Sequence, residues 1–254
     1  MAKTICVTNQ KGGVGKTTTT YALSLGLKYK GYRVLIIDLD PQGNLSFSVE
    51  AETEESPTIY EVLRHECSAE EAIQHTELID IIPSNILLSG VDLEFTHTGR
   101  EFLLREALLN VQNKYDYIII DTPPSLNILT INAFTVSDKI IIPMIADIFS
   151  LQGITQLYET IDRVKKYCNS SIIIEGILLT RYNNRAILST EIKGTTEMVA
   201  KELNTTVFNT HIRTSIVIQE AQTKQENLYY YAPKNAAVSD YMSFVEELLA
   251  REGK

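Results

Sequence analysis

The stretch Gln10-Lys11-Gly12-Gly13-Val14-Gly15-Lys16-Thr17-Thr18 decides the fold of this 254-residue chain. Residues 4–8 before it form a short β-branched run, and a helical pattern begins at Lys16. Glycines let backbone amides approach an anion with no Cβ in the way, and the first turn of a helix adds free N–H groups. A strand, a glycine-rich loop and a helix in this order predict a phosphate-binding P-loop.

Each part of the loop has an expected task in holding ATP or ADP with Mg²⁺. The Lys16 ammonium suits the β- and γ-phosphate oxygens, and the Thr17 hydroxyl suits Mg²⁺. A glycine-rich turn with an incidental lysine is the alternative, which the strand, the spacing and the Gly-Lys-Thr triplet together disfavour. The loop residues expected to bind ATP are Lys11, Gly12, Gly13, Val14, Gly15, Lys16, Thr17 and Thr18.

Two aspartates follow apolar runs further along the chain. Asp121 ends the run 117–121, and α/β sheets bind ligands at the carboxyl ends of their strands. We therefore expect Asp121 in the Mg²⁺ shell; a helix N-cap is the alternative. Asp40 lies in Asp38-Leu39-Asp40-Pro41-Gln42-Gly43-Asn44, where proline favours an extended turn and Gly43 keeps it deformable. The residues alone would make Asp40 a turn cap before proline.

Short β-branched runs alternate with longer helical patterns, which predicts one α/β domain over residues 1–254 with a mostly parallel sheet and helices on both faces. Several runs are continuously apolar, as expected of strands covered on both sides. The expected strands are 4–8, 33–38, 78–82, 117–121, 139–143 and 172–180. The expected helices are 16–30, 100–113, 125–136, 151–167, 186–203 and 236–251.

Composition narrows the class of protein. No run of about 18 apolar residues or cleavable leader is visible, and three scattered cysteines fit a reducing cytosol better than a disulfide framework. The net charge of −9 comes from one region, since residues 50–106 hold 14 acidic and 3 basic side chains. A solvated acidic face is the ordinary reading of such a stretch. The more specific interpretation is that these acidic side chains repel DNA or acidic partners from that side of the protein.

A second lysine sets this loop apart from the general P-loop pattern. Gln10 stands where that pattern has glycine, and Lys11 follows it. The arrangement Lys-Gly-Gly-Val-Gly-Lys-Thr resembles the deviant Walker A loop of the ParA/MinD/nitrogenase iron-protein superfamily. The resemblance implies that Lys11 reaches the phosphates of the other subunit in a nucleotide-sandwich dimer. It also implies that Asp40 belongs to the metal site and orients or deprotonates the attacking water, with Asp38 as its partner.

The likeness covers nearly the whole chain and points to the short, Soj-like ParA ATPases. It implies a weak Mg²⁺-dependent ATPase for plasmid or chromosome partition, in the cytoplasm at the nucleoid, without the N-terminal helix-turn-helix domain of larger ParA proteins. Its partners would be a second copy bound through ATP, non-specific DNA and a ParB-type protein that stimulates hydrolysis; no membrane is expected. The motifs that carry the likeness include Ile81-Ile82-Pro83-Ser84-Asn85, Asp121-Thr122-Pro123-Pro124-Ser125, Glu175-Gly176-Ile177-Leu178-Leu179-Thr180 and Val207-Phe208-Asn209-Thr210.

The likeness is weaker where DNA and adenine would bind. The family often has Ile-Pro-Arg before its last helices, whereas this chain has His211-Ile212-Arg213. We expect Arg185 and Arg213 to contact DNA phosphates, with ordinary surface ion pairs as an equal alternative. Adenine contacts are expected from the turn at 180–183, including Arg181, and from Ile212.

Other members of the superfamily supply the competing readings. A MinD-like cell-division or cargo-positioning ATPase at a membrane needs a basic amphipathic C-terminal helix, whereas the polar side of helix 238–251 is acidic. An iron-protein reductase needs paired cysteines near the switches, which are missing. The run Tyr229-Tyr230-Tyr231 suggests a tyrosine kinase tail, but we expect a short strand and turn there. A small-molecule ligase has no sequence signature here.

Overall fold

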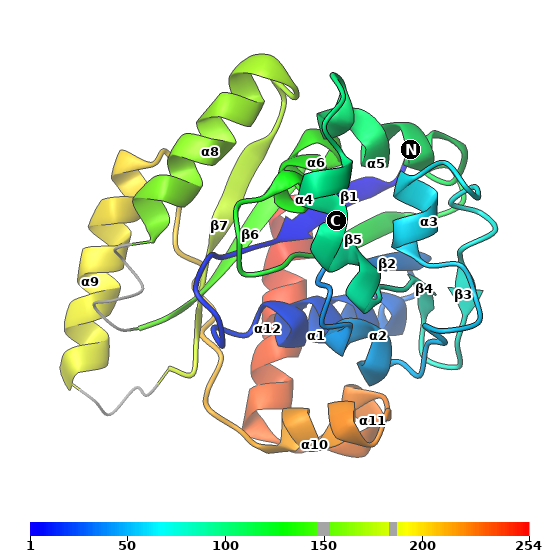
Figure 1. Ribbon diagram of the computed structural model, residues 1–254. Helices are drawn as coiled ribbons and strands as arrows, with labels where there is room; N and C mark the ends of the chain where they lie inside the picture. The colour runs from blue at the N-terminus through cyan, green and yellow to red at the C-terminus, as the bar shows by residue number, and fades with distance from the viewer. Residues whose placement is uncertain (147–152, 183–186, 254) are drawn as a thin grey trace.

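A seven-stranded sheet forms the centre of the molecule, in the order β3-β4-β2-β5-β1-β6-β7 (Figure 1). The computed structural model describes residues 1–146, 153–182 and 187–253, without the side chains of residues 187–192. Every neighbouring pair of strands is parallel except the short pair β3 and β4. The strands are β1 (Lys3–Val7), β2 (Val34–Asp38), β3 (Gln74–His75), β4 (Asp80–Ile82), β5 (Tyr117–Asp121), β6 (Lys139–Ile145) and β7 (Ile173–Thr180).

Helices cover both faces of this sheet (Figure 1). The longer ones are α1 (Lys16–Tyr29), α6 (Ile128–Val136), α8 (Ile154–Tyr167), α9 (Ile187–Glu202) and α12 (Ala236–Arg251). The shorter ones are α2 (Asn44–Ser48), α3 (Ile59–Leu63), α4 (Val91–Glu94), α5 (Leu103–Ala107), α10 (Val217–Thr223) and α11 (Leu228–Tyr231), with 3-10 turns η1 (Ile86–Gly90), η2 (Arg100–Phe102) and η3 (Leu108–Asn110).

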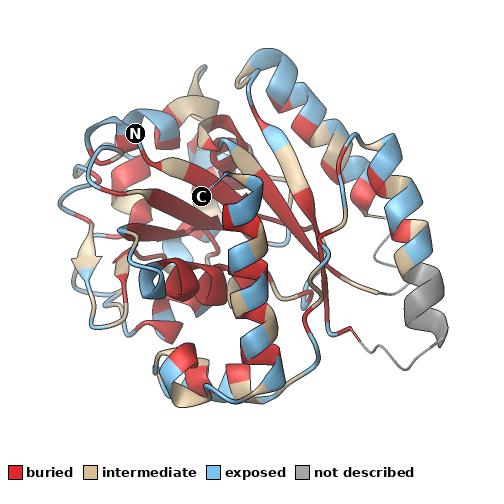
Figure 2. Ribbon diagram, turned by 180° about the vertical axis from the view of Figure 1, so that it is seen from behind, coloured by how far each residue is buried: buried red, intermediate tan, exposed pale blue. Residues whose placement is uncertain are grey.

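Alternate side chains of the central strands point into two separate cores. In β5, Ile118 and Ile120 pack with α5, α6 and α8, whereas Ile119 packs with α1 and α12. Figure 2 shows these central strands almost wholly buried. Burial on both faces explains why the strands read as continuous apolar runs. The expected fold class, a single-domain α/β structure with a mostly parallel sheet, is confirmed.

The helix expected over 100–113 is wrong in detail, because it is broken into η2, α5 and η3. The side chain of Asn132 in α6 explains the break. Its Oδ1 accepts from the Leu104 backbone N–H at 3.0 Å, and its Nδ2 donates to the Arg100 carbonyl at 2.8 Å. Those are the two groups that would bond to each other in a continuous α-helix.

The strand expected at 229–231 is also wrong, because these tyrosines form α11. The Asn227 side chain caps it by accepting from the Tyr229 N–H at 3.0 Å. Tyr229 is buried, and its hydroxyl donates to the Ala22 carbonyl of α1 at 2.8 Å. Tyr229 thus belongs to the core contact between α11 and α1, and the run lies in a helix and not in a flexible tail.

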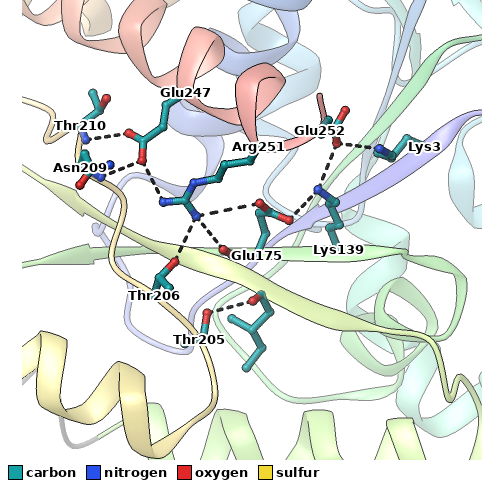
Figure 3. A network of polar contacts seen from close by, with 11 residues as sticks. Lys3, Lys139, Glu175, Thr205, Thr206, Asn209, Thr210, Glu247, Arg251 and Glu252 are labelled. Atoms are coloured by element: carbon teal, nitrogen blue, oxygen red, sulfur yellow. Dashed lines mark hydrogen bonds and ion pairs between the residues drawn. The ribbon is translucent and has the colours of Figure 1, made fainter. Parts of the chain in front are cut away.

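The C-terminal helix is fastened to the body of the protein, as its apolar stripe predicted. Tyr241, Val245 and Leu248 of α12 are buried. Figure 3 shows the polar network at its end, where Arg251 donates to the Glu175 carbonyl of β7 at 3.0 Å and pairs with Glu247 at 2.8 Å. Within the described ranges, no helix is both long enough and apolar enough to cross a bilayer.

Candidate nucleotide site

The glycine-rich loop joins the end of β1 to the start of α1, as the sequence predicted. Gly13 and Gly15 have φ values of 73° and 92°, in the left-handed region where other residues are strained. Gly15 is the N-cap of α1 and supplies no side-chain cap. The first N–H groups of α1 are thus without a capping side chain at the point where a phosphate is expected.

Hydrogen bonds to neighbouring strands fix the shape of the loop. Asn9 accepts from the Lys11 N–H at 3.0 Å and donates to the Pro143 carbonyl at the end of β6 at 2.8 Å. The Thr180 hydroxyl, at the end of β7, donates to the Val14 carbonyl at 2.8 Å. The cradle is therefore held from two directions before any ligand binds.

Lys16 lies within this cradle and is only 7 % exposed. Its Nζ donates to the Lys11 carbonyl at 3.3 Å, across the loop. Burial lowers the pKa of the Lys16 ammonium, while the charges of Asp121 and Asp40 oppose that shift. A buried cation so placed favours an anionic ligand that restores its charge balance.

Asp121 ends β5 directly beside α1. The Thr17 hydroxyl donates to its Oδ2 at 2.6 Å, and the Thr20 hydroxyl donates to its Oδ1 at 3.3 Å. Strand register places Asp38, at the end of β2, opposite Asp121. Burial raises the pKa of the Asp121 carboxyl, and the neighbouring charge of Asp38 raises it further.

Asp38 and Asp40 have different tasks in the loop after β2. Asp38 is fully buried and accepts from the Ser46 N–H at 2.9 Å, the Ser46 hydroxyl at 2.8 Å and the Asp40 N–H at 3.0 Å. It therefore ties α2 to the loop, while burial raises the pKa of its carboxyl. Asp40 lies on the nucleotide side and accepts from the Gln42 N–H at 3.0 Å.

The oxygen atoms gathered here fit a hard divalent cation. Thr17 and Asp121 are already in hydrogen-bond contact, and Asp40 lines the same hollow as Thr17. Burial raises the pKa of the Asp38 and Asp121 carboxyls, and Mg²⁺ would offset the charge that they carry once ionised. Over the described residues, no group of three or more His, Cys, Asp or Glu side chains is arranged to hold a metal ion. Mg²⁺ at this site would therefore take further oxygen ligands from phosphates and water, which is its usual habit.

Two adjoining hollows extend from the loop. The first, about 570 Å³, lies over the phosphate loop and Asp40. The second, about 320 Å³, reaches Ile212 between the ends of β7 and α12. Gly15, Thr18 and Arg181 line both. Together they offer room for phosphates at one end and a nucleoside at the other.

Of the two residues expected to contact DNA, the structure describes only Arg213, which lines the second hollow beside Ile212. Arg213 is half-exposed and held by Asp240, through Nε–Oδ2 at 2.8 Å and Nη2–Oδ1 at 2.6 Å. Its backbone N–H also donates to Asp240 at 3.0 Å. Arg185 lies outside the described residues.

Sequence reasoning missed several polar residues around the site. The Ser84 hydroxyl donates to the Asp40 carbonyl at 2.6 Å. Gln222 of α10 accepts from the Thr18 hydroxyl at 3.3 Å and donates to the Ser48 hydroxyl at 3.2 Å, joining α1 to α2. Ser84 lies within a motif that carried the family likeness, but its partner 44 residues away left no local signal. The position of Gln222, 204 residues after Thr18, could come only from the fold.

Comparisons with known proteins agree with this geometry. A family model described as an AAA domain matches residues 2–174. The sporulation initiation inhibitor protein Soj of Bacillus subtilis is 39 % identical over 98 % of this chain and 99 % of its own length. The chromosome partitioning protein ParA of Caulobacter vibrioides is 38 % identical over 98 % of this chain and 95 % of its own.

A solved structure shares the fold over the same extent. Cobyrinic acid a,c-diamide synthase from Mycobacterium smegmatis, with bound ATP analogue and magnesium, superposes with a TM-score of 0.86 at 30 % identity. The match covers 100 % of this chain and 98 % of that one. Because the sequence relatives are both closer in identity and nearly equal in length, the chain belongs to the Soj/ParA-like family of P-loop partition ATPases.

Proposed function

We propose that this protein is a DNA partition ATPase that binds ATP with Mg²⁺, dimerises through the bound nucleotide and leaves DNA after hydrolysis. The observation that carries the proposal is the site itself. Lys16 and Asp121 are buried, Thr17 donates to Asp121, and the loop bearing Asp40 closes one side of the hollow that Lys16 and Thr17 line. The identity to Soj and ParA proteins supports the cellular task.

The loop residues divide the binding of ATP among them. The backbone of Gly12, Gly13 and Gly15 and the start of α1 would surround the phosphates, with Lys16 at the β- and γ-oxygens. Thr17, Asp121 and Asp40 would hold Mg²⁺, which supplies charge neutralisation at the phosphates when bound. Arg181 and Ile212 would border the nucleoside in the second hollow.

Asp40 is proposed to act on the attacking water. Its carboxylate would orient the water and take up its proton as the water oxygen bonds to the γ-phosphorus and ADP leaves. Asp38 positions this group, since its carboxylate accepts from the Asp40 N–H at 3.0 Å. The weak turnover expected of this family suits a switch whose loop must move before it reacts.

Lys11 is proposed to serve the other subunit. It begins the loop, where its backbone N–H donates to Asn9 and its carbonyl accepts from Lys16. A lysine at the edge of the site can approach the phosphates of a facing copy and stabilise charge there, as an arginine finger does. ATP binding and dimerisation would then be one event.

The ATP dimer is proposed to bind DNA without sequence preference and to respond to a ParB-type protein, in the cytoplasm at the nucleoid. Arg185 and Arg213 remain the proposed phosphate contacts. Arg213 would have to exchange Asp240 for a DNA phosphate, so its contribution depends on a competition between two anions.

Sizing and DNA binding of Asp40→Ala, each with ATP and with ADP, test this function together. We expect a stable DNA-binding dimer with ATP and a monomer with ADP, because nucleotide binding is kept while hydrolysis stops. An ATP dimer that binds anionic liposomes and ignores DNA would favour a MinD-like ATPase instead. Wild-type turnover by Asp40→Ala would refute the role given to Asp40.

A further inference from the structure

A third hollow, of about 690 Å³, lies on the far side of the Asp40 loop from the nucleotide site. Gln42 and Phe47 line both hollows, so only the Asp40 loop and α2 separate them. The remaining wall is the segment from Ser84 to Leu87, at the start of η1. We call this hollow the switch groove. Nothing in the proposed nucleotide chemistry uses it.

The floor of the switch groove is apolar and open to solvent. Phe47, Ile86 and Leu87 are 56 %, 62 % and 50 % exposed. Three large apolar side chains gathered at one exposed hollow are typical of a surface that is covered by a partner. Their exposure also distinguishes the groove from an enclosed pocket for a small molecule.

One rim of the groove is acidic. Glu50, Glu52, Glu54 and Glu55 are all exposed on the loop after α2, and Glu54 lines the groove. The Glu52 carboxylate accepts from the N–H groups of Glu54 and Glu55 at 2.7 and 2.8 Å, which fixes the loop. Among the residues that the structure describes, no lysine or arginine forms an ion pair with these four carboxylates. Glu54 therefore brings negative charge to the groove, and the other three carboxylates add to it from the same loop.

The groove is connected to the residue proposed to activate water. Ser84 lines it, and its hydroxyl donates to the Asp40 carbonyl at 2.6 Å. The Ser84 N–H donates to the Ser46 hydroxyl at 2.9 Å, and that hydroxyl donates to Asp38 at 2.8 Å. A ligand that displaces the 84–87 segment therefore acts on the backbone of Asp40 through one hydrogen bond.

We propose that the switch groove binds a cationic segment of a partner protein, with one or two apolar side chains on the floor and lysine or arginine at the acidic rim, and that its occupancy repositions Asp40. This inference rests on the proposed ATPase function and gives a place for its regulation. Nucleic acid is opposed by the four carboxylates. A second copy docking through the same groove would bring two acidic rims together, which like charges disfavour.

Binding is tested with a fluorescein-labelled synthetic peptide of 12 residues in which pairs of leucines alternate with pairs of lysines. A second peptide, in which glutamate replaces every lysine, serves as the charge control. The rim variant is Glu54→Lys/Glu55→Lys, and its matched control is Glu77→Lys/Glu106→Lys, two exposed acids of the same acidic region outside the groove. The floor variant is Leu87→Asn, and its control is Leu109→Asn on η3, where the leucine is 55 % exposed against 50 % for Leu87. Anisotropy titrations give each affinity, and hydrogen exchange reports on residues 40–48.

We expect the lysine peptide to bind and the glutamate peptide not to bind. The affinity of the lysine peptide should be about tenfold lower for the rim and floor variants than for wild type. For both control variants it should stay within about twofold of the wild-type affinity. Residues 40–48 should change their exchange rate on binding. Equal weakening in rim variant and control, or no saturable binding, overturns the groove. Rim variants that alter ATP-dependent dimer formation without affecting the peptide would assign the groove to a second copy and refute the proposal. DNA binding with ATP and with ADP is measured separately, in the absence of peptide. A failure of the proposed ATPase function is then distinguishable from a failure of the proposed groove.

Discussion

The Thr17 hydroxyl donates a 2.6 Å hydrogen bond to Asp121, joining the first turn of α1 to the end of β5. The contact brings the expected hydroxyl and carboxylate ligands of Mg²⁺ together before the ion binds. Neither group has to move far to exchange this bond for a shared metal ion. Mg²⁺ and nucleotide should therefore bind in a strongly coupled way.

Replacing Thr17 with valine tests that coupling. We expect ADP affinity without Mg²⁺ to change little, and the gain in affinity on adding Mg²⁺ to fall roughly tenfold or more, because a metal ligand is lost. Titration calorimetry with and without Mg²⁺ measures both. Thr19→Val is the matched control, since Thr19 lies two residues further along α1 and its hydroxyl is 3.2 Å from the Tyr241 hydroxyl of α12. An unchanged Mg²⁺ effect in Thr17→Val would contradict the assignment.

Alanine substitutions of Lys11 and Lys16 should have different effects on ATP binding and on dimer formation, although both residues belong to one loop. Lys16→Ala is expected to abolish measurable ATP binding, because it removes the buried cation of the cradle. Lys11→Ala should keep ATP binding and lose the ATP-dependent dimer. Calorimetry and light scattering on the same samples check the two outcomes. An ATP dimer of Lys11→Ala would refute the role in trans.

The buried carboxylates predict how the nucleotide-free protein responds to pH. The pKa values of Asp38 and Asp121 are raised in the folded state, chiefly by burial, so the folded protein holds protons that the unfolded chain has released. The free energy of unfolding should therefore fall as the pH rises from the ordinary carboxylate range, near ~4, towards neutrality. Thermal unfolding of Asp121→Asn should show a weaker pH dependence over that interval. Saturating Mg²⁺ and ADP should also weaken it; a stability that rises with pH in wild type would contradict the argument.

The sequence was sufficient for the fold and for the centre of the site, for one physical reason. Parallel strands end at the same edge of a sheet, so an aspartate after an apolar run can be placed beside a glycine-rich loop without knowing any other contact. Register then sets Asp121 opposite Val7 and Asp38. Long-range side-chain hydrogen bonds could not be predicted from the sequence. Asn132 breaks the helix expected over 100–113, and Ser84 reaches Asp40, through contacts that follow from the fold and leave no periodic signal.

A glycine in α1 offers a test of packing far from the nucleotide. A Cβ on Gly26 would lie 2.7 Å from the Tyr229 hydroxyl of α11 and 2.7 Å from Val245 of α12. Both neighbours are buried, so Gly26→Ala should destabilise the protein by about 1–3 kcal/mol through overpacking. Gly194→Ala in α9 is the control, since a Cβ there meets nothing within 4 Å and should stabilise the helix by up to ~1 kcal/mol. Urea unfolding measures both; equal effects of the two changes would contradict the close packing of α1 against α11 and α12.

The pair of Arg213 and Asp240 predicts an unusual effect of removing an acidic residue. Asp240 holds the Arg213 guanidinium through two short contacts, so a DNA phosphate must compete with it. Asp240→Asn should therefore strengthen DNA binding of the ATP-bound protein several-fold and steepen its salt dependence, because one more cation becomes available to phosphates. Arg213→Glu should weaken binding.

The control for these variants is the pair of Arg33 and Asp116, which directly precede the central strands β2 and β5 at their amino-terminal ends. It has the same geometry, with Nη2–Oδ1 at 2.8 Å and Nε–Oδ2 at 3.2 Å, and Arg33 is more exposed than Arg213. Arg33→Glu changes the net charge by as much as Arg213→Glu but lies away from the proposed DNA surface. Filter binding at several salt concentrations compares the four proteins. If Arg33→Glu and Arg213→Glu reduce affinity equally, overall charge governs binding and Arg213 has no specific contact with DNA.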